Sequence, residues 1–393
     1  MQKKHLLIAL VLYGISAIIS FSAFSYWTKS KVVVPKNGST GETLLGALLD
    51  IDPDEPKDQT CPLNGKLYTA TELNAWEKRR PLYVMIENHP DSRPQAGLSR
   101  ADVVFEAVAE GGVTRFGALF YCAAQVQELE LAPIRSARTY FVDWASGFNF
   151  PMYVHVGGAN VPGTTDALGQ IADYGWSLEN DINQFSVGYP TFVRDYNRIP
   201  GKDLATEHTM VTTTEKLWAV AEEREWTNLS PDRIVNRRVV PGTDWKDGFE
   251  PWTFEEETPS AGDVRKISYG FWDGYGDYAL NWSYDGSQDA YLRVMGGQSH
   301  IDLNNDEQIA VKNVVVLLTS EKGPINEKKH IIYGTTGTGD ALIFKHGEVI
   351  EATWSKPKRT DELRFVDSRG KDIPMARGLT WISVVGVGTD VEY

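Results

Sequence analysis

Cysteine is scarce in this sequence, and several short motifs that mark catalytic sites are missing. The 393 residues contain two cysteines, Cys61 and Cys122. One disulfide between them would close a loop of about 60 residues and stabilise the fold by about 4 kcal/mol; two buried free thiols are the alternative. There is no Cys-x-x-Cys pair, no Gly-x-Ser-x-Gly turn and no His-x-x-x-His spacing. The sequence signatures of thiol redox enzymes, α/β-type serine hydrolases and helical zinc sites are therefore excluded.

Basic residues are also in deficit. The chain has 39 Lys and Arg against 53 Asp and Glu, a formal net charge of −14. Four of the lysines fall in the first 31 residues, so the remainder is more acidic still. This balance argues against a nucleic-acid partner and against adhesion to anionic lipid headgroups. Because 42% of the residues are hydrophobic, the chain can bury sizeable cores, and its length suggests two domains.

Long apolar runs are absent after Lys31, but residues 6–27 form one. This run carries no charge, is bracketed by lysines, and as a helix is long enough to cross a hydrocarbon core of roughly 30 Å. It predicts a single-pass anchor in the cytoplasmic membrane, with the bulk of the chain extracytoplasmic. The alternative is a signal peptide cleaved near residues 23–25, which would make the protein secreted. No cysteine near the end of the run offers a lipid-attachment site.

Shifts in composition divide the chain into parts. The predicted fold class is an α/β N-terminal domain plus a mainly β C-terminal domain, preceded by one transmembrane helix. Many short strands with turn signals predict a sandwich or small barrel for the second domain. The predicted boundaries are 1–31 for the anchor, 32–60 for a flexible stalk, 61–240 for the α/β domain, 241–263 for a linker and 264–393 for the β-rich domain.

Local patterns within the first domain indicate particular elements. Residues 81–86 read as a buried strand. Gly111 and Gly112 separate two alternating segments and predict a hairpin, since glycine adopts positive φ freely. Thr212 with Glu215 three residues later predicts a capping box that opens a helix.

Polar side chains are concentrated where the predicted strands of the first domain end. In open α/β sheets such strand ends converge on one crevice, so we expect these side chains to share a site. The candidate ligand-binding residues are Glu87, Asn88, His89, Arg93, Arg115, Arg135, Ser136, Arg138, His155, Gly157 and Gly158.

Two chemistries fit these candidates. Arg135 and Arg138 at a helix start, with Arg115, suit a phosphate or carboxylate, because a guanidinium binds such groups bidentately and stays charged. The weaker alternative is a metal site. Its ligands would be His89, His155 and His208, with Glu87 as a further ligand or base. No catalytic residue and no cofactor is predicted.

Several longer stretches resemble one known family. They are CPLNG at 61–65, VMIENHP at 84–90, EGGVTRF at 110–116, PIRSAR at 133–138, YVHVGG at 153–158, GEVIEATW at 347–354 and GLTWISVV at 378–385. These stretches resemble the YerB-like family of bacterial cell-surface proteins, many of them lipoproteins. The resemblance implies an N-terminal α/β domain followed by a β-rich one, outside the membrane. It supplies no reaction and no catalytic residue.

The sequence therefore predicts a membrane-anchored envelope protein. Its first domain is expected to bind an anionic or glycan-derived cell-wall ligand, or a partner that acts on the cell wall. The alternative function is a metal-assisted hydrolase of envelope polymers that uses Glu87, His89 and His155.

Overall fold

The computed structural model describes residues 49–235, 237–256 and 261–393. The predicted membrane helix at residues 6–27, and with it the predicted contact with the cytoplasmic membrane, lies outside these residues. Among the residues that are described, no helix is long and apolar enough to cross a membrane.

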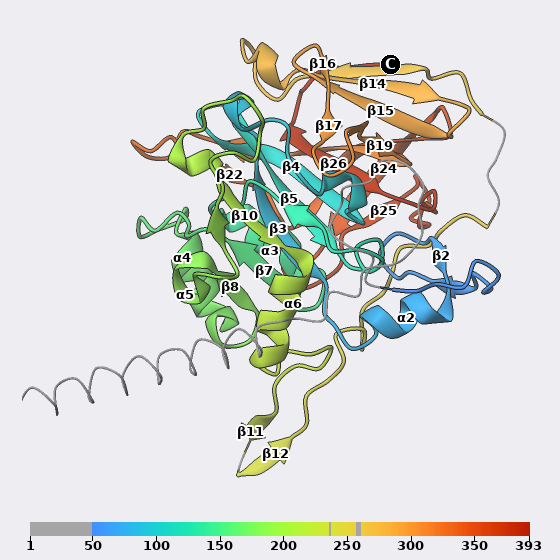
Figure 1. Ribbon diagram of the computed structural model, residues 1–393. Coiled ribbons are helices and arrows are strands. Elements are labelled where there is room, and N and C mark those ends of the chain that lie inside the picture. Colours follow the sequence, from blue (N-terminus) through green and yellow to red (C-terminus); the bar gives the residue numbers. More distant parts are fainter. Residues whose placement is uncertain (1–48, 236, 257–260) are drawn as a thin grey trace, which may run out of the picture. The chain divides into compact units, whose positions relative to one another are not determined.

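One large sheet organises the described part of the chain (Figure 1). Its central strands are buried on both faces and are correspondingly rich in Val, Ile and Leu. In spatial order the ten strands are β25 (Arg364–Val366), β24 (Glu348–Lys356), β23 (Gly337–Lys345), β20 (Asn313–Thr319), β26 (Thr380–Gly386), β4 (Val103–Glu110), β5 (Val113–Phe120), β3 (Leu82–Glu87), β7 (Met152–His155) and β8 (Asp181–Asn183).

The predicted fold class was wrong, because the described structure is mostly β and one sheet combines strands from both predicted segments. Strand β26, near the C-terminus, pairs in parallel with β4 from the first half and with β20 from the second. The described residues of the second half, 241–256 and 261–393, form no separate sandwich or barrel. Local patterns could not reveal this arrangement, since the pairing of β4 with β26 joins residues almost 280 positions apart (Thr380 with Val103). The buried runs at 313–319 and 380–386 are typical of strands. The sequence of such a run does not indicate which other strands it pairs with.

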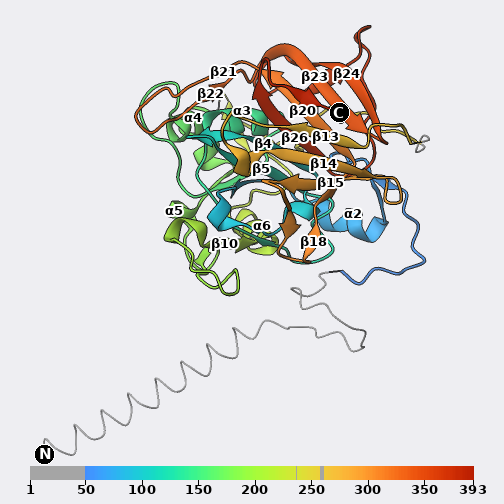
Figure 2. The ribbon, with the colours of Figure 1, turned by 90° about the horizontal axis from the view of Figure 1, so that it is seen from above.

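A smaller sheet covers one face of the large sheet, and helix α3 (Thr139–Ser146) packs against the other (Figure 2). On the first face Trp282 contacts Trp381 with ring centroids 5.8 Å apart. On the second face Trp144 of α3 stacks on Phe105 at 5.5 Å. The smaller sheet contains β16 (Gln298–Ser299), β15 (Ala290–Met295), β14 (Leu280–Asp285), β13 (Lys266–Tyr269) and β27 (Val391–Glu392), with β19 (Ala310–Val311) paired to β15.

The remaining elements are short. The other α-helices in the described ranges are α2 (Ala70–Trp76), α4 (Ala167–Asp173), α5 (Gln184–Val187) and α6 (Thr214–Glu223). Two- and three-stranded ribbons contain β1 (Gln59–Thr60) with β2 (Leu67–Tyr68), β6 (Glu130–Leu131) with β10 (Met210–Thr213) and β9 (Val193–Arg194), β11 (Arg233–Val235) with β12 (Arg238–Val240), β17 (Ile301–Asp302) with β18 (Glu307–Gln308), and β21 (Glu321–Lys322) with β22 (Ile332–Tyr333).

Predictions of local elements met mixed outcomes. The hairpin turn at Gly111 and Gly112 is confirmed: both residues have positive φ between β4 and β5. The capping box was wrong by one residue. Thr213 caps α6 by accepting from the Lys216 backbone N–H, whereas Thr212 is still in strand β10.

Cys61 and Cys122 form a disulfide with a sequence separation of 61. Both residues are fully buried. The bond ties the segment before α2 to the end of β5, so it fastens the start of the described chain to the large sheet.

Removing this disulfide should lower the free energy of unfolding by about 4 kcal/mol. The unfolded chain then regains the conformational entropy that it loses when the crosslink closes the loop between Cys61 and Cys122. Urea denaturation of the Cys61→Ser/Cys122→Ser variant at neutral pH measures the difference. A loss below about 1 kcal/mol would contradict the expected contribution of the crosslink.

Candidate functional site

The last residue of strand β3, inside the large sheet between β5 and β7, is a buried carboxylate at the C-terminal end of the strand. Glu87 is its last residue and is 4% exposed. A buried carboxylate requires charged or hydrogen-bonding partners. One oxygen of Glu87 lies 3.1 Å from Nε of Arg135, and the other lies 2.8 Å from Nδ1 of His208. Glu87 thus joins a predicted arginine and a predicted histidine at one point.

His89 completes this cluster from the loop that follows β3. Its ring stacks on that of His208, with centroids 5.0 Å apart and planes inclined by 17°. His89, Asp91 and His208 each offer a ligand atom within 4.8 Å of the others. A metal ion lies in the plane of each imidazole that binds it, so these nearly parallel rings do not both point at one position. Since the His89 side chain is 38% exposed, its ring has room to turn toward one.

A second carboxylate, Glu110, holds the other two predicted arginines. Its two oxygens lie 3.1 Å from Arg115 and 2.6 Å from Arg138. Burial alone would raise the pKa of Glu110, but these guanidinium groups outweigh burial and lower it to about 2. Both arginines are therefore occupied by an internal carboxylate, and this pairing limits what they can offer to an external anion.

The amide of Asn88 connects the loop to the interior. It donates to Oγ1 of Thr114 at 2.6 Å and accepts from Nε of Arg93 at 3.1 Å. Asn88 also lies 3.3 Å from Glu106, whose carboxylate pairs with Arg293 at 2.8 Å. Both members of this ion pair are completely buried. Arg93 is thereby positioned by groups that belong to the core.

Arg93 opens onto a cavity of about 410 Å³ between the two halves of the chain. Its Nη1 donates to the Asp277 carbonyl oxygen at 2.9 Å. Lys202 lines the same cavity and donates to the carbonyl oxygens of Pro90 and Arg93, each at 3.3 Å. Neither cation is in an ion pair with a carboxylate among the described residues. The lining residues are Pro90, Arg93, Pro94, Lys202, Asp277, Met295, Gly296, Gln298, Ser299, His300 and Ile301.

Few ionisable groups set the net charge of this cavity. Burial lowers the pKa of His300 well below its ordinary value, and the nearby Arg293 and Arg93 lower it further, so this imidazole is neutral. Asp277 is the acidic residue of the lining, against the two cations Arg93 and Lys202. The cavity is therefore a positively charged recess with amide and hydroxyl groups at its rim.

His155 lies apart from these groups. Its side chain is fully buried, with Nε2 2.6 Å from Asp181 and Nδ1 2.6 Å from the Gly157 carbonyl oxygen. Both ring nitrogens are thus engaged inside the protein. The convergence expected from the strand ends holds for Glu87, His89 and Arg135, but the structure does not bring the His155 ring to the same place.

The other predicted residues contribute backbone. The Ser136 carbonyl accepts from Arg115 at 2.8 Å. The Gly157 N–H donates to Asn183, so it is not free for an anion. Gly158 packs so closely against Leu168 and Ala137 that a Cβ there would clash.

Sequence reasoning missed Asp91, Lys202 and the wall formed by residues 295–301. Asp91 stands two positions after His89, a spacing that could have been noticed. Nothing in the sequence connects Lys202 or residues 295–301 to the loop after β3, because only the tertiary fold brings them together.

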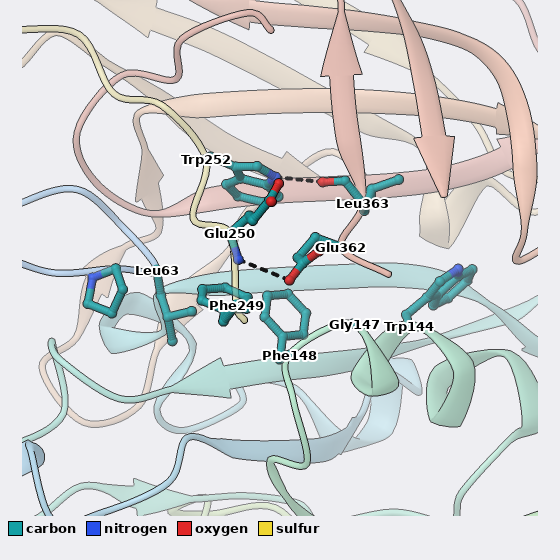
Figure 3. A pocket seen from close by; sticks show the side chains of 10 residues that line it. Leu63, Trp144, Gly147, Phe148, Phe249, Glu250, Trp252, Glu362 and Leu363 are labelled. Carbon is teal, nitrogen blue, oxygen red and sulfur yellow. Dashed lines mark hydrogen bonds between the residues drawn. The ribbon is translucent and has the colours of Figure 1, made fainter. Parts of the chain in front are cut away.

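Another cavity, shown in Figure 3, is apolar and very small. Phe148 and Phe249 line it, and its accessible volume of about 20 Å³ suits a single water molecule. Nε1 of Trp252 donates to the Leu363 carbonyl at 2.6 Å, a hydrogen bond that joins the two chain segments on this side of the cavity (Figure 3). It is a gap in the packing rather than a ligand site.

Fold and site together define a mostly β protein built from two interleaved segments with a polar cavity between them. The chain belongs to the DUF3048 family, a protein family of unknown function. The model of its N-terminal domain matches residues 68–227 and that of its C-terminal domain matches residues 271–382. The resemblance predicted from the sequence is thereby confirmed.

Two comparisons agree with this assignment. The chain is 30% identical over 338 residues to the protein named "Putative lipoprotein YerB" of Bacillus subtilis (strain 168), covering 86% of this chain and 89% of that protein. The crystal structure of YerB from Bacillus subtilis superimposes with a TM-score of 0.66 at 25% identity, over 86% of this chain and 100% of that one.

Replacing Glu110 by Gln should destabilise the protein by about 3 kcal/mol at pH 7, because two buried guanidinium groups lose their carboxylate. The pKa of Glu110 in the folded state, about 2, lies below its ordinary value of 4.5. The ionised carboxylate therefore contributes its full stabilisation of the fold above pH 4.5, and this stabilisation disappears as the pH falls through about 2. Urea denaturation at pH 7 and pH 3 should show the gap between wild type and variant shrinking by more than half. A gap that is constant with pH would contradict the ionic origin.

Proposed function

We propose that this protein is a membrane-anchored extracytoplasmic protein that binds an anionic fragment of the cell wall in the cavity lined by Arg93 and Lys202. The location is supported by the relative named as a putative lipoprotein and by the disulfide, which suits an oxidising compartment. The observation that carries the ligand class is the pair of cations in the recess, which bond to neutral carbonyl and amide oxygens.

Cations held in this way favour an anion. Each carbonyl contact orients the side chain without neutralising it, so the positive charge remains available to a ligand. A cavity of about 410 Å³ lies within the usual range for small-molecule sites. Gln298 and Ser299 at the rim are exposed and offer an amide and a hydroxyl, the groups that orient a polar ligand.

This assignment moves the anion site away from Arg135 and Arg138. Those guanidinium groups face Glu87 and Glu110 at ion-pair distance, so a ligand would have to displace an internal carboxylate. Arg93 requires no such exchange.

The test is calorimetric titration with two soluble probes, peptidoglycan fragments released by a muramidase and glycerol-phosphate oligomers. We expect Arg93→Gln/Lys202→Gln to lose roughly tenfold to a hundredfold in affinity, the value of one or two charge-assisted hydrogen bonds. Arg369→Gln/Lys371→Gln is the matched control, because it removes two exposed cations from a distant turn and should bind like wild type.

Two results would contradict the proposal. One is unchanged affinity in a double variant whose circular dichroism and unfolding midpoint match those of wild type. The other is a wild-type protein that binds neither probe. Lys202→Gln alone guards against misfolding, since half-buried Lys202 bonds only to backbone carbonyls at 3.3 Å, whereas Arg93 bonds to the buried Asn88.

The alternative function, a metal-assisted hydrolase of envelope polymers, is favoured by one observation. Glu87 bonds to Nδ1 of His208, as carboxylates do behind metal-binding histidines, and His208 offers a ligand atom within 4.8 Å of those of His89 and Asp91. If this alternative is correct, the wild-type protein retains zinc or manganese after dialysis. The His89→Ala/His208→Ala variant loses the metal, and the control variant His155→Ala retains it. Equal metal content in all three proteins, with no peptidoglycan cleavage, would rule it out.

A further inference from the structure

The β11–β12 hairpin stands apart from the body of the molecule. Figure 1 shows the two strands at the end of a ribbon that extends below α6, away from the large sheet. Arg233 pairs with Val240, Ile234 with Val239 and Val235 with Arg238.

Apolar side chains on both faces of this ribbon are exposed. Ile234 and Val239 lie opposite each other on one face and are 81% and 65% exposed. Val235 and Val240 lie on the other face and are 49% and 46% exposed. An isolated two-stranded ribbon cannot bury both of its faces against itself. Four exposed β-branched residues within eight positions therefore indicate a surface that something else covers.

The charge of the hairpin is opposite to that of the chain. Residues 233–240 contain three arginines and no acid, whereas the whole chain carries −14. Arg237 lies in the turn, with φ +63°, and both Arg237 and Arg238 are exposed. The overall acidity that argues against adhesion to anionic lipids thus does not hold at this tip.

The base of the hairpin is firmly attached. The Asn228 N–H donates to the Lys78 carbonyl at 3.1 Å, and the Trp245 N–H donates to the Asn228 carbonyl at 2.9 Å. Trp226 and Trp245, just outside the ribbon, are buried. The base of the hairpin is therefore joined to the core at residues 226–228 and at Trp245.

We propose that the tip of the β11–β12 hairpin inserts into the headgroup region of an anionic bilayer. A bilayer interface surrounds an inserted ribbon and covers both apolar faces at once, whereas a flat protein surface covers one. Arg237 and Arg238 then meet lipid phosphates while the aliphatic side chains leave water. This contact is separate from the ligand cavity and goes beyond the proposed function.

The experiment uses single cysteines in the full chain. Both native cysteines are in the disulfide, so an introduced cysteine is the only thiol to label. Val239→Cys and Val240→Cys probe the two faces, and Val387→Cys, 77% exposed beyond β26, is the control. Each carries a nitrobenzoxadiazole dye and is reconstituted in vesicles of phosphatidylglycerol and phosphatidylcholine.

Labels at both Val239 and Val240 should gain about twofold or more in emission, shift to the blue and be quenched by spin-labelled lipid, because the dye leaves water for the interface. The control should change little. Adding Arg237→Gln/Arg238→Gln, or using phosphatidylcholine alone, should remove most of the gain.

Three outcomes would overturn the proposal. The first is unchanged emission at both hairpin positions. The second is a gain that depends on protein concentration without lipid, or on one face only, which identifies a second copy or another protein. The third is an equal gain in phosphatidylcholine that the arginine substitutions leave intact. Because none of these variants touches Arg93 or Lys202, the result is independent of the ligand titration.

Discussion

The ion pair between Glu106 and Arg293 is the contact on which the arrangement of this protein depends. Glu106 belongs to β4 of the first family segment and Arg293 to β15 of the second. Trp381 contacts both, donating its indole N–H to Glu106 at 3.0 Å while the guanidinium of Arg293 lies 4.2 Å from its ring centroid. A completely buried charge without its partner is strongly destabilising, so neither segment can leave the other.

The ion pair between Glu106 and Arg293 also explains where the cavity lined by Arg93 and Lys202 lies. Asn88 touches Glu106 and orients Arg93, while Arg293 donates to His300, which lines the opposite wall. The charged groups of the interior therefore position both sides of the recess. A ligand there would contact two segments that separate family models describe.

What the sequence predicted correctly was local. The hairpin at Gly111 and Gly112, and the polar end of β3 at Glu87, follow from glycine conformation and from the end of a buried strand. What it missed depends on contacts between distant residues. The parallel pairing of β26 with β4 has no local signature, and for that reason the sheet that the two segments share was not predicted. His155 and His89 were predicted to share a site because each stands where a strand ends, yet the His155 ring is buried with Nε2 2.6 Å from the Asp181 carboxylate.

The central place of β26 has a consequence for synthesis. Residues 380–386 are made long after β4, yet they fill the gap between β4 and β20 in the middle of the sheet. Until they arrive, β4 presents an open hydrogen-bonding edge, the feature that recruits stray strands during folding. The nascent polypeptide must therefore leave this sheet incomplete until residues 380–386 are made, and a ribosome that stops before them would release a half-sheet prone to aggregation.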